Sequence, residues 1–299
     1  GDILSFRYYD ASADIVLDIS ETYEFSTNEQ LGSMVEPYEL NITTTVGYSI
    51  ELDGIDLLSF YALPTDTSVG NMFAQLENLS PAIMGQGTAA NYSNGFWLGS
   101  LMHIESVAGY WIIIDGQSSL NIEGIPTNPS IVYDLTDGLN LISYPYSGSS
   151  PLDETIPADA KGAIDAIIGE GVAAMNNNGN WQGALLNLSG TKGYWFITNQ
   201  EVSFSYIPPV EGSVRQTSSI RSVPMDFSFK QSSYQAFYFI KSATLNGEQL
   251  DIEDMIIAYN NDVIVGSRYW YGDVTDVPAM GLGAGAGYAG YCTSGDRVT

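Results

Sequence analysis

The alternation of hydrophobic and polar residues predicts strands along most of this chain. Leu4, Phe6 and Tyr8 alternate with other residues near the N-terminal end, and Phe237 and Phe239 do so near the C-terminal end. An alternation of period two places every second side chain on one face of a strand. Asn-Gly pairs, which are typical of two-residue hairpin turns, lie between several of these runs. We therefore predict a mainly β fold built from β-sandwich domains.

The middle of the chain carries two copies of one module. The motifs that begin at Gly54, Asn94 and Gly109 recur 84 positions later (138 − 54) at Gly138, Asn178 and Gly193. Three blocks with one offset indicate an internal duplication. We predict an α+β module in which a strand leads into a short helix, an Asn-Gly hairpin and a Gly-Tyr-Trp strand. Helical spacing of apolar residues places these helices at 68–79 and 158–168.

The glycine before each Tyr-Trp pair has a predicted role. A glycine at Gly109 and Gly193 lets the backbone approach a neighbour closely before two large rings pack. Tryptophan recurs at matching places in both copies, which a shared core requires, so we expect the module tryptophans to be core residues. These are Trp97, Trp111, Trp181 and Trp195.

These patterns divide the chain into five segments. The linker is assigned from its Pro, Gly and Ser content, and the last segment from its repeated strand patterns. The segments are a strand-rich start (1–50), the first module (51–128), the second module (129–208), a linker (209–223) and a C-terminal β-sandwich (224–299).

The two ends of the chain share a pattern. Gly1–Ser5 and Gly295–Thr299 both read Gly-Asp-x-aliphatic-hydroxyl, but only the first runs on into a strand, Phe6–Tyr9. On this pattern we expect the C-terminal domain to lack a strand of the type that the N-terminal end carries. Chance similarity, donation of residues 2–10 to a neighbouring copy, closure onto the chain's own C-terminal domain, and one unit of a tandem array all fit this pattern. Donation of a strand can build a polymer.

Charge narrows the classes of partner. The 299 residues include 35 Asp and Glu against 9 Lys and Arg, a formal net charge of −26. Such a surface repels phosphate backbones and anionic lipids, so we expect neither nucleic acid binding nor membrane insertion. One cysteine, Cys292, excludes an intrachain disulfide. The single histidine, His103, is expected to be a packed residue rather than a base or a ligand.

The candidate functional residues follow from these patterns. No catalytic motif stands out, so we predict no enzymatic activity, although abundant carboxylates leave a polysaccharide-active enzyme open. Tyr110, Tyr194 and Trp270 are candidate contacts for a surface glycan. Acidic clusters at Asp251, Glu253, Asp254, Asp273 and Asp276 are candidate calcium ligands, calcium being the one cofactor considered. The predicted donor strand comprises Asp2, Ile3, Leu4, Phe6, Tyr8 and Tyr9, and the acceptor end comprises Tyr291, Gly295, Asp296 and Val298.

A family resemblance accompanies these motifs. The runs at 236–239, 257–262, 265–268 and 277–281, followed by Gly295-Asp296, resemble β-sandwich modules repeated in large secreted surface or adhesin-like proteins of marine bacteria. The duplicated module is similar to Trp-Gly-Tyr-Trp modules of bacterial surface and S-layer-type proteins. The resemblance implies an extracellular or cell-surface, non-catalytic role and identifies no ligand.

We therefore expect a structural subunit that assembles with copies of itself, head to tail, into a filament or surface array. A glycan-binding adhesin or phage-fibre module and a polysaccharide-active enzyme remain the alternatives at this point.

Overall fold

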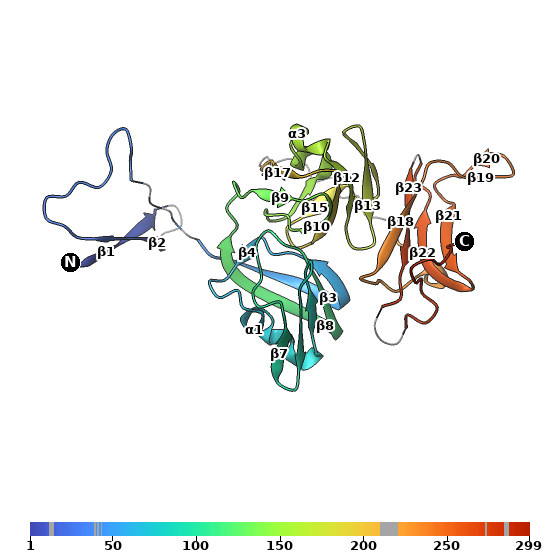
Figure 1. Cartoon of the computed structure of the whole chain (residues 1–299), viewed down its shortest axis with the longest axis horizontal. Helices are drawn as coiled ribbons and strands as arrows, with labels where there is room; N and C mark the ends of the chain where they lie inside the picture. Colours follow the sequence, from blue (N-terminus) through green and yellow to red (C-terminus); the bar gives the residue numbers. More distant parts are fainter. Residues whose placement is uncertain are drawn as a thin grey trace.

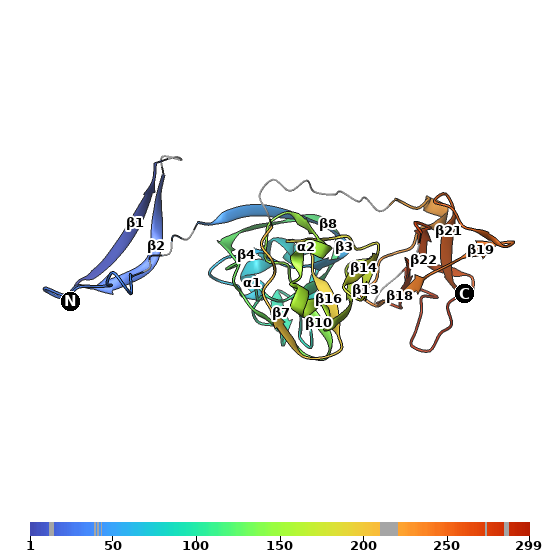
Figure 2. The same cartoon turned by 90° about the horizontal axis from the view of Figure 1, so that it is seen from above.

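The computed structural model describes residues 1–11, 15–38, 40, 42, 44–209, 221–272, 274–283 and 287–299. These residues are mainly β, with a few short helices, which confirms the predicted fold class. Figures 1 and 2 show an N-terminal ribbon at one end, two modules in the middle and the C-terminal domain at the other end. Residues 210–220 of the predicted linker lie outside the described residues.

The N-terminal ribbon consists of two antiparallel strands, β1 (Ile3–Asp10) and β2 (Ile15–Glu24). Its open end is closed by a hydrogen bond from the Phe25 amide to the Asp2 carbonyl and by an ion pair between the Gly1 amino group and Glu24. The ribbon stands apart from the modules in both views (Figures 1 and 2). A lone two-stranded ribbon is marginally stable in water at best.

The first module is a sheet in the order β3-β8-β5-β6-β7, with two short helical segments against it. Long strands β3 and β8 pair along most of their length, and β4 pairs with the end of β8. The elements are β3 (Val46–Leu58), β4 (Ala62–Leu63), α1 (Val69–Met72), the 3-10 helix η1 (Ala74–Leu79), β5 (Ala82–Met84), β6 (Ala89–Ser93), β7 (Phe96–Gly99) and β8 (Tyr110–Pro126).

The second module repeats this sheet in the order β10-β16-β12-β13-β14. Each strand lies 84 positions after its counterpart in the first module, so the duplication predicted from the sequence is a duplication of the fold. The elements are β9 (Tyr133–Leu135), β10 (Gly138–Ile142), β11 (Ser149–Pro151), α2 (Leu152–Thr155), α3 (Ala158–Lys161), β12 (Ile164–Ile168), β13 (Ala173–Asn177), β14 (Asn180–Gly183), β15 (Asn187–Ser189), β16 (Tyr194–Thr198) and β17 (Val202–Phe204).

The helix predicted over 158–168 is wrong in its second half. Helix α3 ends at Lys161, and Ile164–Ile168 form strand β12 between β13 and β16. A short apolar run fits helical spacing and strand spacing equally well. β-branched isoleucines favour the strand. β12 is the central strand of its sheet, so side chains on both of its faces can pack.

The Asn-Gly turns have the backbone that the sequence predicts. Asn94 and Gly95 have φ angles of 54° and 85°, and Asn178 and Gly179 have 54° and 87°. Two consecutive residues with positive φ define the type I′ hairpin turn, whose twist matches that of the flanking strands. These turns join β6 to β7 and β13 to β14 at matching places in the two modules.

The two modules pack against each other with an internal pseudo-twofold relationship. The Gly109 amide donates to the Leu141 carbonyl (3.2 Å), and 84 positions on, the Gly193 amide donates to the Leu57 carbonyl (3.0 Å). A shared apolar cluster fills this contact. It consists of Ile55, Leu57, Trp111 and Leu141, with Met84, Ile113 and Trp195 packed around them. The remaining module tryptophans, Trp97 and Trp181, pack against the core of their own module. Of the four tryptophans predicted to be core residues, Trp111 is buried, and the other three are half-buried against a core.

The C-terminal domain is built from two strand pairs that pack on each other. The first pair is β18-β23 and the second is β21-β22, and their shared core includes Val265 from one pair and Val277 from the other. The elements are the 3-10 helix η2 (Met225–Phe227), β18 (Gln235–Ile240), β19 (Thr244–Leu245), β20 (Glu248–Gln249), β21 (Met255–Asn260), β22 (Val263–Tyr269) and β23 (Thr275–Met280).

Candidate functional site

The free edge of β21 is the first candidate surface. β22 covers one edge of β21, and in the described part of the chain no other strand is assigned as a partner of β21. Thr299 lies beside the opposite edge, where its amide donates to the Tyr259 carbonyl (2.9 Å) and its carbonyl accepts from the Tyr259 amide (2.8 Å). This double exchange is that of a hydrogen-bonded antiparallel pair, so the chain enters the edge of β21 as a strand.

The predicted acceptor residues shape the approach to this edge. Asp296 accepts hydrogen bonds from the Thr293 amide (2.8 Å) and the Asn260 side chain (3.2 Å), and the Thr293 bonds lower the pKa of its carboxyl. Gly295 has a φ of 98°, which a residue with a side chain rarely adopts. Val298 packs against the domain core, and buried Tyr291 accepts a hydrogen bond from the Lys230 amide. Residues 293–296 therefore form a turn, after which Val298 reaches the domain core and Thr299 reaches the edge.

A groove of about 550 Å³ lies beside this turn. Val298 and Asp296 line one side and β18 lines the other, where the Tyr238 side chain is 45% exposed. The lining of this groove therefore comes from β18, the end of β23 and the C-terminal segment that leads to Thr299.

The predicted donor residues lie on the N-terminal ribbon. β1 holds Ile3, Leu4, Phe6, Tyr8 and Tyr9, and the Asp2 carbonyl closes the ribbon's end. Ile3 is 67% exposed, Tyr9 56% and Tyr8 42%, and Leu4 is also exposed. A strand edge with this much exposed apolar surface is a template for pairing with another chain. Because β1 pairs with β2 and stands at the end opposite the C-terminal domain, closure onto the chain's own domain is not the arrangement present (Figure 1).

The two module tyrosines do not present a face to a glycan. Tyr110 and Tyr194 are 2% and 3% exposed. Each hydroxyl accepts a backbone hydrogen bond from the segment before its own strand, Tyr110 from Glu105 (2.8 Å) and Tyr194 from Ser189 at the end of β15 (2.7 Å). Burial raises the pKa of Tyr110 to about 12 and raises that of Tyr194 further. These tyrosines anchor the preceding segment in both modules, and their assignment as glycan contacts is wrong because their rings are enclosed.

Trp270, the third candidate glycan contact, is also enclosed. Its side chain is 5% exposed, and its amide donates to the Asp254 carbonyl (2.9 Å). A ring that stacks on a sugar needs an open face, so this assignment is wrong as well.

The acidic residues proposed as calcium ligands separate into different environments. Asp254 and Asp251 accept backbone hydrogen bonds inside one loop, and Glu253 pairs with Arg221 (2.9 Å). Asp273 lies outside the described residues. Among the residues that the structure describes, no group of three or more acidic, histidine or cysteine side chains gathers in a way that could hold a metal ion.

Asp276 instead joins the C-terminal domain to the second module. Its fully buried carboxylate accepts hydrogen bonds from the Ala173 and Ala184 amides (both 3.0 Å) and from the Tyr271 hydroxyl (2.5 Å). Arg268 lies 3.4 Å from the same carboxylate and also donates to the Gly171 carbonyl (2.6 Å). Burial raises the pKa of Asp276, and the Arg268 charge opposes that rise. The assignment of Asp276 as a calcium ligand is therefore wrong, because protein donors occupy its oxygens.

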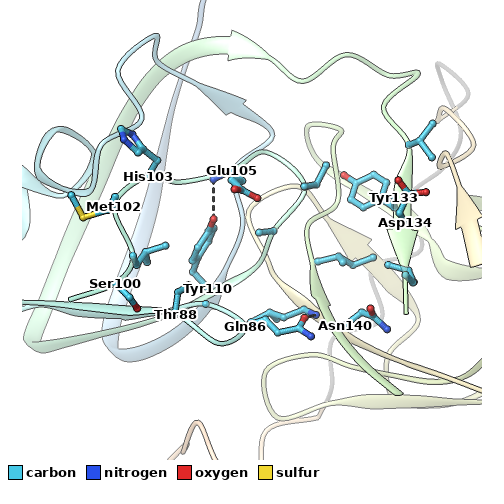
Figure 3. Close-up of a pocket in the computed structure, with 18 residues that line it drawn as sticks. Gln86, Thr88, Ser100, Met102, His103, Glu105, Tyr110, Tyr133, Asp134 and Asn140 are labelled. Carbon is cyan, nitrogen blue, oxygen red and sulfur yellow. Dashed lines mark hydrogen bonds between the residues drawn. The ribbon is translucent and has the colours of Figure 1, made fainter. Parts of the chain in front are cut away.

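A second groove, of about 730 Å³, lies where the two modules meet. Figure 3 shows His103 and Met102 on the first module's side and Tyr133 and Asp134 on the second module's side. Gln86 bridges the modules by donating to the Leu139 carbonyl and accepting from the Leu141 amide (both 2.8 Å). His103 is exposed at this groove, so the expectation that it is packed is wrong.

Three of these features were not predicted from the sequence: the groove between the modules, the pseudo-twofold contact and the role of Arg268. The groove and the pseudo-twofold contact depend on how the two modules meet, which no local pattern encodes. Arg268 had a usable signal, because a lone cation inside the apolar run Val263–Tyr269 indicates a buried partner.

Comparison of the chain with protein-family models, curated proteins and solved structures found no match. None of the described helices is long and apolar enough to span a membrane.

Proposed function

We propose that this chain is a non-enzymatic structural subunit, extracellular or on the cell surface, that assembles head to tail into a filament or surface array. The N-terminal strand of one copy is donated to the C-terminal domain of a neighbouring copy. The extracellular setting rests on the resemblance to secreted surface modules and on the surface charge, whose self-repulsion salt screens.

The observation that carries this proposal is the isolated ribbon. β1 and β2 pair with each other and expose large apolar side chains, while the C-terminal domain offers a strand edge at the far end of the molecule. A donor at one end and an acceptor at the other form a chain that extends in one direction.

The apolar residues of β1 supply the driving force. Burying a side chain such as Leu4 or Phe6 contributes about 1.5–3 kcal/mol each before the cost of ordering the joint. New backbone hydrogen bonds along the added strand contribute about 0.5–1.5 kcal/mol each. Micromolar affinity requires these terms together to exceed the costs of association and ordering by about 8 kcal/mol.

The test compares the wild-type chain with Leu4→Asp by negative-stain electron microscopy and by light scattering after gel filtration. We expect the wild type to form elongated assemblies and Leu4→Asp to remain monomeric, because a carboxylate at this position would be buried without a partner. Ser5→Asp adds the same charge at the neighbouring position on the other face of β1, and it should still assemble.

Monomers of the wild-type chain over the whole accessible concentration range would refute the proposal. So would equal assembly of the wild type and Leu4→Asp, since the face that contains Leu4 would then play no part.

A further inference from the structure

We infer that the acceptor is the free edge of β21, and that β1 of a second copy adds to it as an antiparallel strand with Arg7 opposite Ile257. The inference rests on the proposed function, because it names the surface and the alignment of the joint. It can fail while assembly itself stands.

The backbone of β21 fixes where an added strand would bind. Tyr259 directs both its amide and its carbonyl toward Thr299. Residues two apart in a strand present their backbone groups to the same edge, so Ile257 and Met255 present theirs beside Tyr259. The irregularity between Ala258 and Tyr259 reflects an extra residue on β22, because Ala258 pairs with Gly266 and Tyr259 with Ile264. The hydrogen-bonding pattern of β21 therefore continues along the free edge.

The pattern shared by the two chain ends supplies the alignment. Aligning Gly1–Ser5 with Gly295–Thr299 places Ser5 at the position of Thr299, opposite Tyr259. Counting along an antiparallel pair then places Phe6 opposite Ala258, Arg7 opposite Ile257 and Tyr9 opposite Met255. The incoming Ile3–Ser5 takes the place of residues 297–299, which leave the edge.

The faces of β1 agree with this alignment. Val298 packs against the C-terminal core while Thr299 hydrogen-bonds to β21. Leu4 occupies the position of Val298, and successive side chains alternate between faces, so Phe6 and Tyr8 also point toward the core. A slip of one residue would turn Ser5 and Arg7 inward instead.

The second strand of the ribbon extends the same apolar face. Leu4 pairs with Tyr23 and Tyr8 pairs with Leu17 across the ribbon. Directly opposed residues lie on one side of a sheet, so Tyr23 and Leu17 accompany Leu4 and Tyr8. Leu17 and Tyr23 are half-buried in the lone ribbon. The ribbon therefore docks as a two-stranded unit with one apolar face.

Disulfide trapping between two separate chains tests the alignment. The native Cys292 is first replaced by Ser in every variant. One chain then carries Arg7→Cys and the other carries Ile257→Cys, and the two are mixed under mild oxidation. A hydrogen-bonded antiparallel pair has Cα atoms about 5.5 Å apart, within disulfide range. In the control, the second chain carries Ile256→Cys instead of Ile257→Cys. Ile256 is the adjacent residue of the same type, and its side chain lies on the other face of β21.

We expect the crosslinked peptide between positions 7 and 257 to exceed that between 7 and 256 at least tenfold. Assemblies in the microscope without a 7–257 crosslink, or with a 7–256 crosslink in its place, would overturn this inference and leave the proposed assembly standing. Absence of both assemblies and crosslinks would overturn the proposed function together with the inference.

Discussion

Gly193 lies against Gly109 at the centre of the contact between the two modules. A methyl group on Gly193 would stand 3.2 Å from the Gly109 Cα atom and 2.7 Å from the Leu58 carbonyl oxygen. Both glycines precede a Tyr-Trp pair, so the close approach that the sequence analysis predicted for them is confirmed. The neighbour that each glycine approaches is the other copy of the module.

Gly193→Ala should destabilise the paired modules. The added methyl group meets a backbone oxygen, which cannot move aside as a flexible side chain would. Overpacking of this kind costs about 1–3 kcal/mol in the free energy of unfolding. Urea unfolding followed by tryptophan fluorescence measures the effect. In the control, Gly162→Ala, the added methyl group meets open space. This substitution should leave the free energy of unfolding unchanged or raise it slightly. Equal stabilities of the two variants would contradict a tight contact at Gly193.

Asp276→Ala should weaken the contact between the C-terminal domain and the second module and destabilise the C-terminal domain. The substitution leaves the buried Arg268 without its charge partner and the Ala173 and Ala184 amides without an acceptor. Breaking a buried pair on one side costs about 3–5 kcal/mol. Differential scanning calorimetry should show the C-terminal domain melting earlier than in the wild type. Glu248→Ala, at an exposed site in β20, should change stability by no more than about 0.5 kcal/mol.

Alkaline pH should unfold the modules through their buried tyrosines. A tyrosine in the unfolded chain has a pKa of about 10, whereas burial raises the pKa of Tyr110 to about 12 in the folded chain. The folded state holds the phenolic proton more strongly, so the stabilisation is complete below pH 10 and is lost as the pH rises toward 12. The loss is about 2–3 kcal/mol for Tyr110.

Urea unfolding at a series of pH values between 9 and 12 measures how the free energy of unfolding falls as the pH rises. Tyr110→Phe removes the ionisable group and should lose less free energy of unfolding over that interval than the wild type does. A wild-type stability that stays level up to pH 12 would contradict the burial of these hydroxyls.

Deletion of residues 297–299 should favour assembly. These residues hold the place on β21 that the incoming Ile3–Ser5 requires, and Thr299 must give up two hydrogen bonds to Tyr259. At about 0.5–1.5 kcal/mol for each bond, the concentration needed for half-maximal assembly should fall about tenfold. Sedimentation velocity over a dilution series measures that concentration. A shortened chain that stays folded and no longer assembles would show that this segment supports the joint and does not compete with it.

Local patterns predicted much of the fold and little of what joins its parts. The duplication and the Asn-Gly turns could be predicted because each depends on residues close together in sequence. The strand at Ile164–Ile168 was missed because its short apolar run fits two periods. Asp276 was assigned to calcium because a sequence shows its carboxylate but not the amides of Ala173 and Ala184, which reach it from about 100 positions away.

The pseudo-twofold contact also limits how the molecule can grow. The two modules use the same surface on each other, so their pairing is isologous and is saturated within one chain. No third module can add to it. The proposed joint between β1 and β21 is heterologous, because it uses different surfaces on its two partners. Duplication thus yields a closed block, and in the proposed assembly extension proceeds through the two ends, which gives the assembly a polarity.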